Sequence, residues 1–196
     1  LSALDKKLRA QVQLELKDLH RRLGLTFVYV THDQEEALSM SDRIAVLKDG
    51  RLIQHGTPSD LYTKPSSRFV ADFMGASNFL AGRVVSSSAT GFTYQVGNSI
   101  FEHDGGTAPS GSQVTLALRP EKIDLLGEGS HARNRLTGTI ENWSYIGTSY
   151  HVLIQTPDAG RFAVNVPAWR HGEPPAIGSH ATIGWDPDAT VTVEGD

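Results

Sequence analysis

The sequence contains no cysteine, no long apolar run and no surplus of basic residues, and each absence excludes a class of protein. Without cysteine, neither a disulfide framework nor a thiolate metal site can form. The longest apolar runs, such as residues 27–30, are far too short to cross a bilayer. The 18 Lys and Arg residues against 22 Asp and Glu give a net charge of −4, which argues against nucleic acid as a partner.

What is present indicates a soluble globular chain with many turns. Hydrophobic residues make up 39% and charged residues 20%, and the 19 glycines favour a turn-rich β segment over a helix bundle. The eight histidines are scattered without zinc-ligand spacing, so we expect no metal site. No charged-then-apolar leader opens the chain. Because the sequence begins inside an apparent motif, we expect it to be a fragment of a longer protein.

Two kinds of periodicity divide the sequence. Before residue 76, apolar stripes and buried runs predict α/β structure. The predicted strand over 26–31 is buried on both faces of a parallel sheet, and a hairpin over 43–54 turns at Asp49-Gly50. The predicted helices cover residues 6–23, 34–40, 58–65 and 67–74. After about residue 78, short runs rich in Val, Ile, Thr and Tyr alternate with turn residues, which predicts an all-β barrel or sandwich. We therefore expect domains at 1–76 and 77–196.

The β segment contains a weak internal repeat with an offset of 56 residues. The matched residues are Leu80, Gly82, Val84, Gly91, Tyr94 and Val96 with Leu136, Gly138, Ile140, Gly147, Tyr150 and Val152. Two similar β units, stacked or intertwined, would explain the repeat, and chance in a Gly- and Val-rich stretch is the alternative.

The strongest candidate for chemistry is His32, within Thr31-His32-Asp33 directly after the predicted buried strand. Ligands of open α/β sheets bind at the carboxyl ends of strands. An imidazole at that edge can hydrogen-bond a terminal phosphate or an attacking water. The alternative is a histidine that caps the following helix. Glu35 and Glu36 are interpreted as a favourable charge pair in the first turn of that helix.

In its wider context, this segment resembles the ATP-binding subunits of ABC-type importers. Five segments are similar in chain order to the D-loop, the switch-histidine loop, the closing hairpin of the nucleotide-binding domain, a linker helix and the signature of the transport-associated OB (TOBE) domain. They are residues 2–5, 31–37, 48–58, 68–75 and 118–123. Residues 77–80, 119–121 and 184–187 look most like those of polyamine importers.

The resemblance implies an α/β remnant of an ABC nucleotide-binding domain followed by an all-β OB-like (TOBE) regulatory domain. It implies that His32 contacts the γ-phosphate of ATP. The D-loop residues at the nucleotide-dimer interface would be Ser2, Ala3, Leu4 and Asp5. The intact parent would use ATP and Mg²⁺, form a homodimer, bind transmembrane permease subunits and lie peripherally on the cytoplasmic side of the inner membrane.

The sequence departs from that family in lacking the motifs that bind ATP. It contains no G-x-x-x-x-G-K-[ST] loop, no signature motif, and no strand carrying the Mg²⁺-binding Asp and catalytic Glu. We therefore expect the parent to be an ATPase, but this chain alone to be inactive and to bind no ATP. The alternative is an OB-type module that senses a small ligand. Nucleic acid is disfavoured as that ligand because residues 79–196 carry a net charge of −5.

The predicted first helix carries an apolar stripe that needs a cover. Its members are Leu8, Val12, Leu16, Leu19 and Leu23. Burying each such side chain is worth about 1.5–3 kcal/mol. We expect a second copy of the chain to cover the stripe, with folding of residues 1–75 onto the β domain as the alternative.

Overall fold

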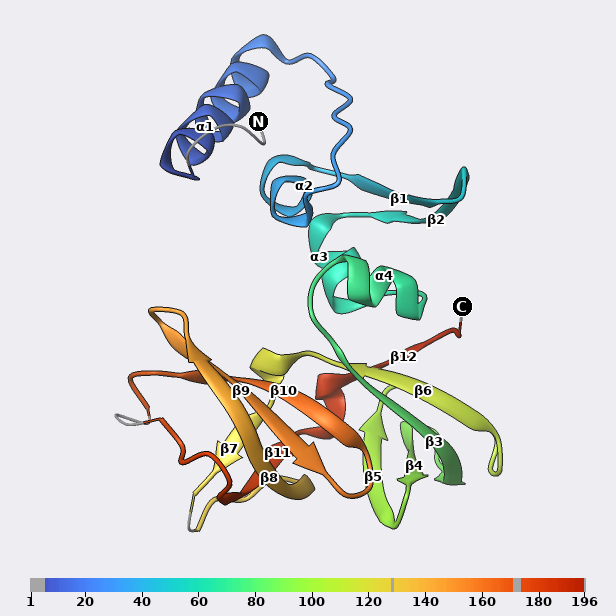
Figure 1. Cartoon of the computed structure of the whole chain (residues 1–196). Coiled ribbons are helices and arrows are strands. Elements are labelled where there is room, and N and C mark those ends of the chain that lie inside the picture. Colours follow the sequence, from blue (N-terminus) through green and yellow to red (C-terminus); the bar gives the residue numbers. More distant parts are fainter. Residues whose placement is uncertain (1–5, 128, 171–173, 196) are drawn as a thin grey trace. The chain divides into compact units, whose positions relative to one another are not determined.

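The computed structural model describes residues 6–127, 129–170 and 174–195, and the chain divides into two compact units, Leu1–Lys64 and Pro65–Asp196 (Figure 1). The division falls twelve residues before the expected boundary at residue 76, so the predicted linker helix belongs to the second unit.

The first unit contains three of the four predicted helices and the predicted hairpin. Its elements are α1 (Lys6–Leu23), α2 (Gln34–Met40), β1 (Ile44–Lys48), β2 (Arg51–Gly56) and α3 (Pro58–Thr63). Gly24 ends α1 with a positive φ of 63°, and its N–H donates to the carbonyl of His20 at 3.0 Å. Asp49 and Gly50 turn between β1 and β2 with φ of 50° and 74°, the positive values that a tight hairpin turn requires.

The prediction of a buried strand over 26–31 is wrong for this chain. The segment is extended but pairs with no strand of the described residues, and Val28 and Val30 are 90% and 91% exposed. A strand forms only when a neighbour accepts its backbone hydrogen bonds, and β1 and β2 pair with each other instead. The stripe on α1 is likewise open within the unit, with Leu16 41% exposed.

The second unit begins with one short helix and is otherwise built from strands, which confirms the all-β prediction. It contains α4 (Arg68–Phe73), β3 (Asn78–Ser87), β4 (Gly91–Val96), β5 (Ser99–Asp104), β6 (Gln113–Leu118), β7 (Asp124–Leu126), β8 (Asn134–Tyr145), β9 (Ser149–Thr156), β10 (Gly160–Pro167), β11 (His180–Trp185) and β12 (Thr190–Val193), with 3-10 turns at Pro120–Lys122 and Pro187–Ala189.

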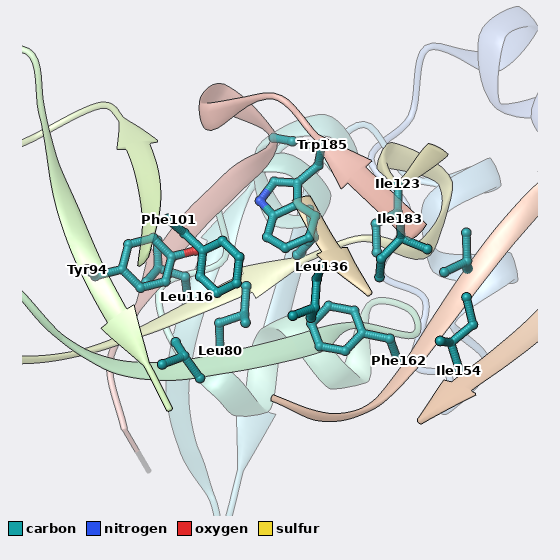
Figure 2. Packing of buried hydrophobic residues seen from close by; sticks show 14 of the residues in the cluster. Leu80, Tyr94, Phe101, Leu116, Ile123, Leu136, Ile154, Phe162, Ile183 and Trp185 are labelled. Atoms are coloured by element: carbon teal, nitrogen blue, oxygen red, sulfur yellow. The ribbon is translucent and has the colours of Figure 1, made fainter. Parts of the chain in front are cut away.

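Among the described residues, these strands form two five-stranded antiparallel sheets of the same design. Their orders are β12-β6-β3-β4-β5 and β7-β11-β8-β9-β10. Period-two burial along β3 and β8 sends alternate side chains into one shared core (Figure 2). Within that core, the centroid of the Trp185 ring lies 5.1 Å from the ring centroid of Phe101 and 6.1 Å from that of Phe162.

The register of the two sheets confirms the internal repeat and corrects half of its alignment. Leu80 pairs with Leu116 as Leu136 pairs with Ile183, and both β3 and β8 have a register shift at the same place, after Val84 and after Ile140. The 56-residue offset therefore holds along these strands.

The offset changes in the next strand of each repeat. Tyr94 faces Val84 on the neighbouring strand, and the residue that faces Ile140 in the same way is Ile154. The structural counterpart of Tyr94 is therefore Ile154 and not Tyr150, because the β8–β9 hairpin is longer than the β3–β4 hairpin.

The two repeats exchange their last strands. In chain order, β7 ends the first repeat and β12 ends the second, yet β7 pairs with β11 of the second repeat and β12 pairs with β6 of the first. Each sheet is thus completed by a strand from the other repeat. Neither half of the sequence contains all the strands of its own sheet.

Two equivalent asparagines fasten the repeats together. Asn78 donates its amide to the carbonyl of Ala163 at 2.8 Å and accepts from the N–H of Ala163 at 2.7 Å. Asn134 makes the same pair of hydrogen bonds with Glu102, at 2.9 and 2.7 Å. Each asparagine side chain thus pairs with the backbone of the third strand of the other repeat, which is β10 for Asn78 and β5 for Asn134. The bonds satisfy backbone N–H and C=O groups that would cost free energy if they were left without partners.

Helix α4 is attached to the β strands at both ends. The N–H of Arg68 donates to the carbonyl of Glu194, and the N–H of Glu194 donates to the carbonyl of Ser66, at 3.1 and 3.0 Å. At the other end, the guanidinium Nη1 of buried Arg119 lies 2.7–3.1 Å from three backbone carbonyls and one hydroxyl, those of Ala71, Gly75, Ala76 and Ser77. These bonds explain why the helix belongs to the second unit.

Candidate functional site

The loop that carries His32 joins the extended segment to α2. Asp33 is the N-cap of α2, and its Oδ1 accepts from the N–H groups of Glu35 and Glu36 at 2.9 and 3.2 Å. The cap is therefore Asp33, so the alternative in which His32 caps the helix is wrong. The side chain of His32 is exposed.

Hydrogen bonds hold both neighbours of His32. The hydroxyl of Thr31 donates to Oε2 of Glu36 at 2.9 Å, and the same hydroxyl oxygen accepts from the N–H of Asp33 at 2.9 Å. The phenol of Tyr29 donates to that Oε2 at 2.7 Å. We call Tyr29, Thr31 and Glu36 the Glu36 cluster. It ties the chain on both sides of His32 to the first turn of α2.

Glu36 is buried, with 5% of its surface exposed, whereas its neighbour Glu35 is exposed. Burying a carboxylate is unfavourable unless hydrogen bonds compensate it, and two hydroxyls provide such bonds here. The pKa of Tyr29 is raised, chiefly because its phenol donates to Glu36, and further by burial and by the negative charges of Glu36 and Asp33. Tyr29 therefore stays protonated and remains a donor.

The sequence indicated His32 but missed the Glu36 cluster. Glu35 and Glu36 were interpreted as one charge pair, and the structure gives them different environments. A usable signal existed: Tyr29 and Thr31 lie two residues apart in an extended segment and so face the same side. The D-loop residues Ser2, Ala3, Leu4 and Asp5 lie outside the described residues.

In residues 6–127, 129–170 and 174–195, no three His, Asp or Glu side chains gather in a way that could hold a metal ion. Within the same ranges, no helix is both long and apolar enough to span a bilayer.

The class of the second unit follows from its sheets and from comparison with known families. Residues 116–193 match the TOBE domain family. A solved structure of the cytoplasmic molybdate-binding protein ModG, in a form with molybdate bound, resembles this chain with a TM-score of 0.50 and 17% identity, over 59% of this chain and 94% of that one. The second unit is therefore an all-β, OB-like fold that contains a TOBE domain.

The particular proteins that the chain resembles are ATP-binding subunits of polyamine importers. It is 44% identical over 170 residues to the spermidine/putrescine import ATP-binding protein PotA of Mesorhizobium japonicum, covering 84% of this chain and 44% of that protein. The PotA proteins of Pseudomonas fluorescens and Rubrobacter xylanophilus are 41% and 39% identical, over 93% and 95% of this chain and 50% of each relative.

The chain spans about half the length of the curated relatives that it matches. The resemblance to ABC importer ATP-binding subunits is thus confirmed over most of the chain.

Proposed function

We propose that this chain is the C-terminal portion of the ATP-hydrolysing subunit of an ABC importer and that it couples ATP hydrolysis to polyamine uptake. The observation that carries this proposal is the sequence identity of about 40% to spermidine/putrescine import ATP-binding proteins along nearly the whole chain. In this proposal, the first unit is the end of the subunit's nucleotide-binding domain, and the second unit is the subunit's TOBE regulatory domain.

In this assignment, His32 contacts the γ-phosphate and helps to orient the attacking water. Catalysis of phosphoryl transfer depends mainly on positioning and on stabilisation of charge, and an exposed imidazole on a loop fixed at both sides suits that role. ATP and Mg²⁺ would be held by residues outside this sequence, since it contains no phosphate-binding glycine loop. The chain alone is therefore expected to be inactive.

The assembly follows from the same assignment. Ser2, Ala3, Leu4 and Asp5 would form the D-loop between two copies of the subunit, and the complex would include transmembrane permease subunits at the cytoplasmic face of the inner membrane. Polyamines are proposed as the cargo because the relatives are spermidine/putrescine import proteins.

The coding sequence ahead of Leu1 provides the first test, since a G-x-x-x-x-G-K-[ST] segment must lie there. The second test is ATP hydrolysis by the longer polypeptide with its permease. Replacing His32 by Ala should lower kcat by at least about 100-fold, while the exposed control His131→Ala should leave it unchanged. Absence of the glycine loop, or full turnover by the His32→Ala variant, would contradict the assignment.

A second candidate function is small-ligand sensing by the TOBE domain. It is favoured by one observation, that the fold is shared with a protein that binds molybdate. Calorimetric titration of this chain with spermidine and with molybdate tests it directly. Heat release with a defined stoichiometry would support sensing, and none with either ligand would exclude both compounds.

A further inference from the structure

The hydrogen bonds around the His32 loop converge on one carboxyl oxygen. Oε2 of Glu36 accepts from Tyr29 and from Thr31, and the Thr31 hydroxyl in turn accepts from the N–H of Asp33. The backbone on each side of His32 is thus connected to the same turn of α2. The imidazole itself stays exposed at the surface.

We propose that Glu36 is a positioning residue that holds the His32 loop in the geometry needed to meet the γ-phosphate. The proposal rests on the function assigned to His32 above. In a reaction controlled by positioning, a displacement of about 1 Å can lower the rate about 100-fold. A loop fixed before ATP arrives keeps that displacement small.

The neighbouring residues allow this role to be separated from helix formation. Asp33 caps α2 through backbone N–H groups, so removing the Glu36 side chain leaves the cap in place. Glu35 is an exposed carboxylate in the same helical turn and provides a matched control for charge. Gln at position 36 retains an oxygen that can accept both hydroxyls, whereas Leu removes the acceptor.

The first experiment uses this chain and needs no ATP. We expect NMR relaxation to report an order parameter near 0.85 for the N–H of His32, as for a rigid backbone. In Glu36→Leu and Thr31→Val the value should fall below about 0.6, and the amide of Asp33 should exchange faster. Glu36→Gln, Thr31→Ser and Glu35→Leu should match the original chain. An unchanged order parameter in Glu36→Leu would overturn the proposal.

The second experiment measures ATP hydrolysis by the longer polypeptide with its permease. Glu36→Leu should lower kcat by about 10- to 100-fold while KM for ATP changes by less than about 2-fold. Glu36→Gln should restore most of kcat, and Glu35→Leu should have no effect. Equal losses in kcat for Glu36→Leu and Glu36→Gln would show that charge, not loop geometry, is what matters.

The two experiments separate failure of this inference from failure of the proposed function. If His32→Ala retains turnover, the role assigned to His32 is wrong, whatever the loop does. If His32→Ala is inactive but Glu36→Leu is fully active, then Glu36 does not position His32 and the proposed function stands.

Discussion

The two units differ in what they do with their apolar side chains. The second unit encloses one large cluster of apolar residues between two sheets that share a core. The first unit leaves the four leucines of the α1 stripe and the segment 25–30 exposed. The second unit can therefore fold on its own core, whereas the first unit needs an apolar surface supplied from elsewhere. Substitutions in each unit can test this contrast.

Truncating one buried side chain in each unit tests the contrast directly. Phe162→Ala should lower the free energy of unfolding of the second unit by about 3–5 kcal/mol, because it leaves a cavity beside Trp185. Leu16→Ala should change the stability of α1 by no more than about 0.5 kcal/mol. All three tryptophans lie in the second unit, so their fluorescence reports its unfolding, and helical circular dichroism reports α1.

A large loss of stability in Leu16→Ala would show that the stripe is covered in solution. It would then favour the expected homodimer, in which a second copy covers the stripe. Sedimentation at several protein concentrations distinguishes these cases, because only a dimer dissociates on dilution.

The attachment of α4 is the next target. Arg119→Met should destabilise the second unit by about 1.5–3 kcal/mol, since hydrogen bonds from a charged donor are lost and carbonyls at the end of α4 lose a partner. Hydrogen exchange should accelerate at the amide of Met74, the C-cap of α4. The exposed Arg83→Met is the control, and equal effects from both variants would refute a specific role for Arg119.

The asparagine bonds between repeats should matter somewhat less. Asn78→Ala and Asn134→Ala should each cost about 1–3 kcal/mol, because the backbone groups of Ala163 or Glu102 lose their partners. The loss for Asn78→Ala should be at least as large as that for Asn134→Ala, because the amide of Asn78 also donates to the carbonyl of Leu118 at 3.3 Å. Asn98→Ala, at an exposed turn, should cost less than about 0.5 kcal/mol in the same denaturant titration.

The smallest effect concerns pH. Burial lowers the pKa of His103, whose Nδ1 lies 2.7 Å from the Thr190 hydroxyl oxygen. In the unfolded chain His103 has an ordinary pKa of about 6.5 and so binds more protons than in the folded state. Stability is therefore full above about pH 6.5 and declines as pH falls below it. Thermal unfolding between pH 7.5 and 5 should show this decline, and His103→Gln should flatten it.

Elements fixed by local chemistry could be predicted from the sequence. The cap at Thr57 forms a capping box with Asp60, and Asp49-Gly50 forms the expected turn, because both depend on residues close along the chain. The strand over 26–31 failed because pairing needs a neighbour that periodicity cannot supply. Within the candidate site, His32 was found from its motif, but the burial of Glu36 was not, since burial depends on packing.

The internal repeat shows the same limit. The offset found along β3 and β8 was visible in the sequence, whereas the partners of Asn78 and Asn134 were not. Those asparagines act on strands 85 and 32 residues away, and no local pattern predicts such a distance. The exchange of β7 and β12 is equally invisible, because either strand could in principle complete either sheet.

That exchange also sets an order on folding during synthesis. β6 leaves the ribosome long before residues 190–193, the strand that must lie along it. Until then the nascent first repeat presents an open edge of backbone donors and acceptors, which is the kind of surface that invites pairing with other chains. The β domain can close only when residues 190–193 have been made, so β12 decides whether the open edge of β6 is protected.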